Sequence, residues 1–270
     1  MASVKSVACQ AGRIDTPALD PIAEARLALG LLDLTDLSDH GTPADIDDLC
    51  AKAVESNVAA VCIWPRFVPQ AVRLLVDSSV RIATVVNFPA GGTDIAATVD
   101  ETVGALADGA DEIDVVLPYR ALIDGDAALA GRLVAAVSEL IERPRRLLKV
   151  ILETGELPDQ ATVALAARIA IESGADFIKT STGKTPVSAT PEAARTMLDV
   201  IRSTPHRVGL KPSGGIRDLA AASAYLQLAR EAMGPSWISP ATFRFGASGL
   251  RDALIAVIQG HDAPGSTSSY

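Results

Sequence analysis

Aromatic residues, cysteines and histidines are all scarce in this sequence of 270 residues. Aromatic side chains make up only 4% of the chain, which has three cysteines and three histidines. Cys9, Cys50 and Cys62 are odd in number and lack CxxC spacing, which argues against a disulfide framework. The histidines lie far apart and lack the HxxxH or HxH spacing common in zinc sites. We therefore expect reduced thiols and no metal ion.

Basic residues are also in deficit, because 24 lysines and arginines stand against 33 aspartates and glutamates, for a net charge of −9. This balance disfavours a nucleic-acid partner, since such binding depends on clustered cations. No stretch approaches the roughly 20 apolar residues that span a bilayer. The segment "MASVKSVACQAGRIDTP" lacks the apolar region of a signal peptide. The sequence therefore predicts a cytoplasmic protein without a membrane partner.

Apolar residues, by contrast, are abundant, at 49% of the chain. Short β-branched runs alternate with Ala-rich amphipathic segments at intervals of about 30 residues, which is the pattern of parallel strands joined by crossover helices. Eight strands are expected, at 29–35, 58–64, 81–87, 111–117, 147–153, 175–181, 207–211 and 243–248. Helices that begin near Thr or Pro, with acids in the first turn, are expected at 42–56, 93–109, 157–174 and 190–203.

The regular alternation favours one fold class. Eight such units without a Pro/Ser-rich linker predict a single closed (β/α)8 TIM barrel over residues 29–260. An open doubly wound sheet is the structural alternative. Residues 1–28 are interpreted as an N-terminal extension with one helix, in "DPIAEARLAL", and residues 261–270 as a flexible polar tail.

Charged side chains interrupt several of the expected strands. They are Asp33, Asp114, Lys149, Lys179 and Lys211, and most lie toward the carboxyl ends of their strands. Buried charges are unfavourable by roughly several kcal/mol each unless they are paired. One such lysine is explained equally well by a solvent-facing ion pair at a strand end. The five together indicate an active site, because barrel active sites form at the carboxyl ends of the strands.

Lysine in such a cluster has a specific chemical use. A neighbouring cation and partial desolvation lower the pKa of a lysine, and the neutral amine then attacks a carbonyl to form a Schiff base. Lys179 and Lys211 form a candidate pair, and Asp114 is a candidate for the proton transfers that imine formation requires. The spacing does not decide which of the two lysines is the nucleophile.

Glycine-rich turns follow the last three expected strands, in "STGK" (181–184), "KPSGGIRD" (211–218) and "FRFGASGL" (243–250). Backbone N–H groups at such turns are the usual phosphate donors of this fold, so we expect a phosphorylated substrate. The "TGK" is not part of a Walker A loop, because the GxxxxG spacing is absent. The candidate phosphate-binding residues are Gly183, Lys184, Gly214, Gly215, Arg217, Gly246 and Ser248.

Five motifs together resemble the deoxyribose-phosphate aldolase family of class I, TIM-barrel aldolases. They are "EIDVVLPYRAL", "LLKVILETGEL", "ADFIKTSTGK", "GLKPSGGIR" and "FRFGAS". The resemblance implies reversible cleavage of 2-deoxy-D-ribose 5-phosphate to D-glyceraldehyde 3-phosphate and acetaldehyde, without metal or organic cofactor. It implies that Lys179 forms the Schiff base, that Lys211 perturbs it and that Asp114 is the acid/base carboxylate. We expect Asp33, Thr35, Cys62, Lys149 and Thr182 to contact the substrate, although Cys62 is also explained as a packed thiol.

Two positions near the C-terminus qualify the resemblance. Gly249 stands where many similar sequences have a serine, which removes a hydroxyl from the expected phosphate site. Tyr270, on the terminal tail, is a candidate proton relay, with a disordered terminus as the alternative.

The expected partners are a phosphorylated deoxy sugar, small aldehydes and a second copy of the chain in a homodimer, because symmetric homo-oligomers are common. Two rival functions remain at this stage. One is a transaldolase-like or fructose-bisphosphate aldolase-like enzyme for another phosphosugar. The other is a phosphosugar-binding protein without catalysis.

Overall fold

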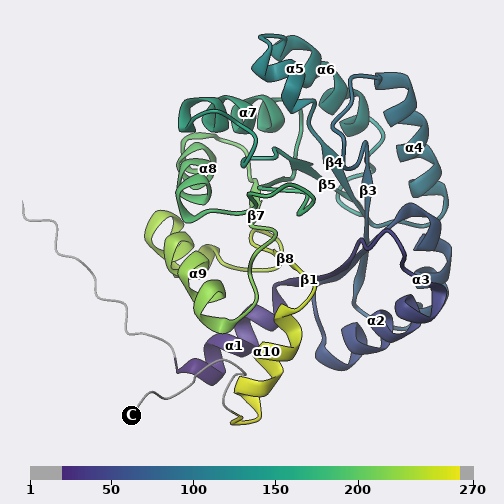
Figure 1. The fold of residues 1–270 in the computed structure, drawn as a ribbon, viewed down its shortest axis with the longest axis vertical. Helices are drawn as coiled ribbons and strands as arrows, with labels where there is room; N and C mark the ends of the chain where they lie inside the picture. Colours follow the sequence, from purple (N-terminus) through teal and green to yellow (C-terminus); the bar gives the residue numbers. More distant parts are fainter. Residues whose placement is uncertain (1–19, 262–270) are drawn as a thin grey trace, which may run out of the picture.

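Eight parallel strands form the centre of the molecule (Figure 1). The structure is a computed structural model and describes residues 20–261. The strands run in the order β7-β6-β5-β4-β3-β2-β1-β8. Their bounds are Leu32–Asp36 (β1), Ala60–Ile63 (β2), Arg81–Val86 (β3), Glu112–Val116 (β4), Leu147–Ile151 (β5), Phe177–Lys179 (β6), Gly209–Lys211 (β7) and Phe245–Ala247 (β8).

The sheet closes between β7 and β8. Leu210 forms a parallel bridge with Phe243, and Ser213 forms one with Gly246. The Gly246 N–H also donates to the Pro212 carbonyl at 2.9 Å. This closure excludes the open doubly wound sheet and confirms the predicted (β/α)8 barrel.

Helices surround the strands (Figure 1). The α-helices are Pro21–Gly30 (α1), Pro43–Ser56 (α2), Val68–Leu74 (α3), Ile95–Ala107 (α4), Tyr119–Ile123 (α5), Ala127–Ser138 (α6), Gln160–Glu172 (α7), Pro191–Ser203 (α8), Leu219–Met233 (α9) and Leu250–Ile258 (α10). Two 3₁₀ turns span Pro65–Phe67 (η1) and Pro235–Trp237 (η2). None of the helices within residues 20–261 is both long and apolar enough to cross a membrane.

Two of the expected helix-start signals, Thr42 and Thr190, form N-caps, whereas α4 and α7 are capped by aspartates and have no acid in the first turn. Thr42 caps α2 in a capping box, in which its hydroxyl accepts from the Asp45 N–H and the Asp45 side chain accepts from the Thr42 N–H. Asp159 and Thr190 cap α7 and α8 in the same position. These caps fix the residue at which each helix begins.

Most of the predicted strands are shorter in the structure by one or two residues at an end, and the largest difference is at the first strand. The expected strand over 29–35 begins only at Leu32, because Leu29 and Gly30 form the last turn of α1. The run "LALGLLDL" is apolar on both sides of the boundary, so hydropathy alone does not separate helix from strand there. Figure 1 shows α1 beside α10 in the lower part of the view.

The barrel interior has two chemically different parts. An apolar sector, made of Leu37 with Ala60, Cys62, Ala83 and Val85, covers the inner face of β2 and β3. The rest contains a charged cluster, which we define as the buried residues Asp33, Glu112, Asp114, Lys149, Lys179, Lys211 and Arg244. A separate layer of aliphatic side chains packs the outer face of the sheet against the helices. The charged cluster is therefore a feature of the interior alone.

Candidate active site

Strand register brings the predicted charges together. Asp114 on β4 pairs with Lys149 on β5, and Lys179 on β6 pairs with Lys211 on β7. Alternate residues of a strand point to the same face. The four side chains therefore project from neighbouring strands into one region of the barrel, as the sequence predicted.

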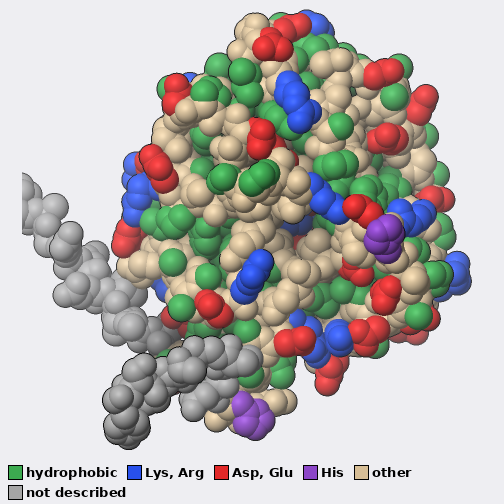
Figure 2. Space-filling view, in the orientation of Figure 1, with side chains coloured by type: hydrophobic (Ala, Val, Ile, Leu, Met, Phe, Trp, Pro, Cys, Tyr) green, Lys and Arg blue, Asp and Glu red, His purple; other side chains and the backbone are tan. Residues whose placement is uncertain are grey.

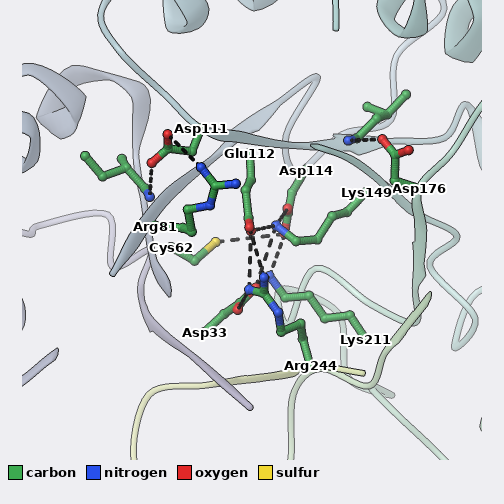
Figure 3. Close-up of polar contacts among 12 residues, drawn as sticks. Asp33, Cys62, Arg81, Asp111, Glu112, Asp114, Lys149, Asp176, Lys211 and Arg244 are labelled. Carbon is green, nitrogen blue, oxygen red and sulfur yellow. Dashed lines mark hydrogen bonds and ion pairs between the residues drawn. The ribbon is translucent and has the colours of Figure 1, made fainter. Parts of the chain in front are cut away.

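Asp114 lies at the centre of this region. Its Oδ1 accepts from the Lys149 ammonium at 2.8 Å, and its Oδ2 accepts from Lys179 at 2.9 Å and from Lys211 at 2.8 Å. Figure 3 shows the side chains of Asp114, Lys149 and Lys211 converging with their neighbours. Burial alone would raise the pKa of Asp114, but the three lysines outweigh it and hold the pKa well below its ordinary value. Asp114 is therefore ionised throughout the neutral range.

Two of the three lysines are held by additional carboxylates. Lys211 lies 2.6 Å from Asp33, and Lys149 lies 2.5 Å from Glu112. Burial opposes their charged forms, but the surrounding carboxylates raise the pKa of both lysines above the ordinary value. Lys149 and Lys211 therefore remain ammonium groups beside the reaction centre.

Arg244 completes the charged cluster, and the sequence analysis missed it. Its guanidinium donates to Asp33 Oδ1 at 2.6 Å and to Glu112 Oε1 at 3.0 Å (Figure 3). Burial alone would lower the pKa of Arg244, but these two carboxylates outweigh it and raise that pKa. Burial alone would raise the pKa of Asp33, but Lys211 and Arg244 outweigh it and hold that pKa below its ordinary value. The signal was present in "FRFGAS", because Arg244 lies two residues before Gly246 and so shares its inward face.

Lys179 differs from the other lysines in its access to solvent. It contacts one carboxylate, Asp114, and it is 3% exposed, whereas Lys149 and Lys211 are completely buried. Lys179 also lines a cavity of about 1310 Å³, and the other two lysines do not. The geometry therefore presents Lys179, rather than Lys211, to a carbonyl compound in the cavity.

The cavity opens at the carboxyl ends of the strands and brings most of the predicted site residues together. Figure 2 shows the molecular surface in the orientation of Figure 1, with acidic and basic side chains interspersed. Of the predicted residues, those lining the cavity are Thr35, Lys179, Thr182, Gly183, Lys184, Gly214, Gly215, Arg217, Gly246 and Ser248. Those that lie beneath it are Asp33, Cys62, Asp114, Lys149 and Lys211.

The glycine-rich turns form one wall of this cavity. Gly214 and Gly215 both have positive φ values, of 83° and 79°, which glycine adopts most readily. Gly249 precedes α10 and provides no side-chain cap. Lys184, a candidate phosphate ligand, forms an ion pair with Asp39 at 2.9 Å, which joins the loop after β6 to the loop after β1.

Glu153 is a second residue that the site predictions missed. Its carboxylate accepts from the Thr182 hydroxyl at 2.5 Å and from the Thr182 N–H at 3.1 Å. Burial raises the pKa of Glu153, and these hydrogen bonds oppose the rise. Its φ of 55° is unusual for a residue other than glycine. Glu153 therefore fixes the loop that carries Thr182 and Gly183 into the cavity.

Cys62 and Thr35 lie at the edge of the charged cluster. The Cys62 thiol is 4.0 Å from Asp114 Oδ2, and burial raises the pKa of that thiol. The Thr35 hydroxyl donates to the Asp33 carbonyl at 2.8 Å. The expected proton relay, Tyr270, lies outside the described residues.

The fold and site define a class, that of (β/α)8 barrel enzymes with a lysine presented to a cavity beside glycine-rich loops. Comparison with known proteins narrows the class. The chain belongs to the DeoC/LacD aldolase family, whose model matches residues 27–255. The protein is therefore an aldolase, and the resemblance found in its sequence is confirmed.

Individual relatives agree with this assignment. The chain is 51% identical over 253 residues to deoxyribose-phosphate aldolase of Agrobacterium fabrum, across 93% of this chain and 97% of that protein. A crystal structure of a candidate deoxyribose-phosphate aldolase from Toxoplasma gondii ME49 is 27% identical, with a TM-score of 0.81 over 90% of this chain and 99% of that one. A candidate enzyme of the same name from Coccidioides immitis is 29% identical, with a TM-score of 0.78 over 89% of this chain and 88% of that chain.

Proposed function

We propose that this aldolase reversibly cleaves 2-deoxy-D-ribose 5-phosphate to D-glyceraldehyde 3-phosphate and acetaldehyde through a Schiff base on Lys179. The observation that carries the proposal is the position of Lys179. It lines the cavity and contacts Asp114, while the two neighbouring lysines stay buried and ion-paired. The substrate is suggested by the name of the Agrobacterium fabrum relative, which is 51% identical to this chain.

The first half of the reaction joins the amine to the sugar. The neutral amine of Lys179 attacks C1 of the open-chain aldehyde and forms a carbinolamine. Protonation of the carbinolamine hydroxyl and loss of water give an iminium ion. The iminium nitrogen then withdraws electrons from the neighbouring carbon atoms.

The second half breaks the carbon–carbon bond. A base removes the proton of the C3 hydroxyl, the C2–C3 electron pair moves toward the iminium nitrogen, and C3 leaves as the aldehyde carbon of glyceraldehyde 3-phosphate. The remaining enamine is protonated at C2, and water hydrolyses the resulting iminium to acetaldehyde and the free lysine. Each bond broken is therefore matched by one formed, without an external oxidant or reductant.

Asp114 is the proposed acid/base group for these steps. Its Oδ2 contacts both Lys179 and Lys211, so one carboxylate oxygen is shared by the reacting amine and a permanent cation. The low pKa of Asp114 makes it a weak base when all three lysines contact it. We assign it proton transfer through a water molecule in the cavity, with Lys211 as the balancing charge.

The phosphate group is assigned to the far wall of the cavity. Backbone N–H groups near Gly183, Gly214 and Gly215 are the proposed donors, together with those at the start of α10. Lys184 and Arg217 line the same wall and supply positive charge. Thr35 and Thr182 are assigned to the sugar hydroxyls that lie between the lysine and the phosphate.

Borohydride trapping tests the proposal directly. The protein is incubated with 2-deoxyribose 5-phosphate or acetaldehyde, reduced, and mapped by mass spectrometry. We expect a stable adduct on Lys179 with either compound, absent in Lys179→Met and retained in Lys52→Met, a change at a lysine that also lines the cavity but is ion-paired with Asp48 rather than Asp114. An adduct on Lys211 would reverse the two lysine roles, and no adduct on folded protein would overturn the Schiff-base mechanism.

Substrate identity needs a separate measurement. Release of acetaldehyde from 2-deoxyribose 5-phosphate, with no turnover of fructose 1,6-bisphosphate, separates the proposed activity from that of other phosphosugar aldolases. The expected homodimer stays a prediction, and the mass of the enzyme in solution, measured by light scattering, tests it.

A further inference from the structure

Ser213 carries a buried hydroxyl that the proposed mechanism does not use. The residue follows β7, lines the cavity and is 4% exposed. Among residues 20–261, no group is in hydrogen-bonding position to its Oγ. Buried hydroxyls are normally paired, so an unpaired one that faces a cavity indicates a partner supplied by a ligand.

The side chain of Ser213 points into the barrel. Arg244 directly precedes β8 and faces inward, where it contacts Asp33, and Gly246, two residues later, lies on the same face. A Cβ atom built on Gly246 would lie 2.2 Å from Ser213 Oγ and 3.2 Å from Lys211 Cε. The hydroxyl therefore occupies the space that glycine leaves open at position 246, next to the Lys211 side chain.

The backbone of Ser213 is held on both sides. Its N–H donates to the Thr180 hydroxyl at 2.9 Å, and its carbonyl accepts from the Ala189 N–H at 3.2 Å. The side-chain hydroxyl is thus the remaining polar group of a fixed residue. Thr154 and Ser181 also have buried hydroxyls without a partner among the described residues, but neither lines the cavity.

We propose that the Ser213 hydroxyl binds the substrate hydroxyl between the reacting carbons and the phosphate, and so selects its configuration. This hydroxyl is at C4 of 2-deoxyribose 5-phosphate and at C2 of glyceraldehyde 3-phosphate. The inference rests on the proposed function, in which the ligand extends from Lys179 to the loop of Gly214 and Gly215. Ser213 lies between the two ends of that ligand. Its side chain is next to that of Lys211 in the barrel interior, and the next residue in the chain is Gly214.

The test uses the condensation direction, with acetaldehyde as donor and D- or L-glyceraldehyde 3-phosphate as acceptor. In Ser213→Ala, kcat/KM for the D acceptor is expected to fall about three- to tenfold, as for loss of one neutral hydrogen bond. The value for the L acceptor should change little, so the D/L ratio falls by the same factor. The matched control, Thr154→Val, removes another buried hydroxyl without a partner among the described residues, one that does not line the cavity, and should keep the ratio.

Two further readouts separate this role from others. Exchange of acetaldehyde methyl protons with deuterated solvent requires only the lysine, and inhibition by inorganic phosphate reports only the phosphate wall; both should match the wild type in Ser213→Ala. An unchanged D/L ratio, an equal fall for both acceptors, or weakened inhibition by phosphate would each overturn the inference. Failure of the proposed function is distinguishable, because the wild-type protein itself would then form no condensation product.

Discussion

Asp114 is the residue on which the chemistry of the barrel depends most. The side-chain nitrogens of three lysines contact its two oxygens, and each lysine comes from a different strand. Like charges in such proximity repel one another strongly when no anion lies between them. A single carboxylate thus allows β5, β6 and β7 to present lysines to the same space.

Replacing this carboxylate tests its double role. In Asp114→Asn, the shape is kept but three buried lysines lose a common carboxylate partner. We expect kcat for cleavage to fall by about 10²- to 10⁴-fold, the usual contribution of a positioned acid/base group. The free energy of unfolding in urea should fall by about 3–5 kcal/mol, because breaking a buried ion pair leaves charge uncompensated.

A surface aspartate provides the matched control for this change. Asp199→Asn removes a carboxylate from an exposed ion pair with Arg202 on α8, away from the cavity, where solvent screens the interaction. Both kcat and the free energy of unfolding should stay close to the wild-type values. Equal kcat in Asp114→Asn and the wild type would contradict the assignment of Asp114.

Strand periodicity predicted individual residues well where the pattern was local. Lys149, Lys179 and Lys211 lie on the inward faces that period-two alternation gave them. The sequence spacing did not separate Lys179 from Lys211, and the two lysines are partners in the register of β6 and β7. What separates them is that Lys179 lines the cavity and that Lys211 contacts a second carboxylate, Asp33 of β1, neither of which a local pattern encodes.

At the scale of elements, the ring of Phe177 on β6 packs against Gly209 on β7. A Cβ atom built there would lie 2.3 Å from the Phe177 ring. Glycine is therefore required at this position by packing, since its φ is not in the left-handed region. Lys179 and Lys211 reach the same carboxylate oxygen because they are partners in the register of these two strands.

Adding one methyl group tests this packing. Gly209→Ala should lower the free energy of urea-induced unfolding by about 1–3 kcal/mol, because the ring of Phe177 must move within a filled interior. The control is Gly104→Ala in α4, where nothing lies within 4 Å of the new Cβ. Alanine favours the helix over glycine, so that variant should gain about 0.5–1 kcal/mol. A gain of stability in Gly209→Ala would contradict the close approach.

The ends of elements were predicted less well than their existence. The strand of residues 32–36 was expected to start at 29, since the apolar run continues from the helix without a break. The capped helices were found where Thr42 and Thr190 indicated, because a capping side chain acts on its own first turn. Local chemistry fixes a helix start, whereas an apolar run leaves the helix–strand boundary open.

At the scale of the whole molecule, the charged cluster joins segments far apart in the chain. Arg244 contacts Asp33 across 211 positions, and Lys184 contacts Asp39 across 145. Neither pair could be predicted from sequence spacing, because both depend on closure of the barrel. For the same reason Arg244 was overlooked, although its motif had been recognised.

The cluster also determines how the whole protein responds to acid. Against burial, neighbouring cations hold the pKa values of Asp33 and Asp114 below the ordinary value, so the folded state keeps these groups ionised. Below about pH 4, the unfolded chain binds protons that the folded chain does not. The stability contributed by both aspartates is therefore complete above that pH and is lost as the pH falls.

Unfolding in urea at several pH values tests this dependence. We expect the free energy of unfolding contributed by these groups to be level between pH 5 and 7, within the range in which they are ionised in both states, and to fall below about pH 4. Asp33→Asn should give a shallower acid decline, because one of the perturbed groups is missing. An equally steep decline in that variant would assign the acid response to other carboxylates.

The apolar sector has a consequence for how the enzyme can diverge. Its side chains on β2 and β3 pack together, and Leu37 of this sector also lines the cavity. Exchanges between apolar residues of similar volume are usually tolerated, at less than about 1.5 kcal/mol. Leu37 is the member of the sector that lines the cavity, and it contributes to none of the ion pairs around Asp114. Exchanges at Leu37 therefore offer a route to accept a different aldehyde while the lysines are inherited unchanged.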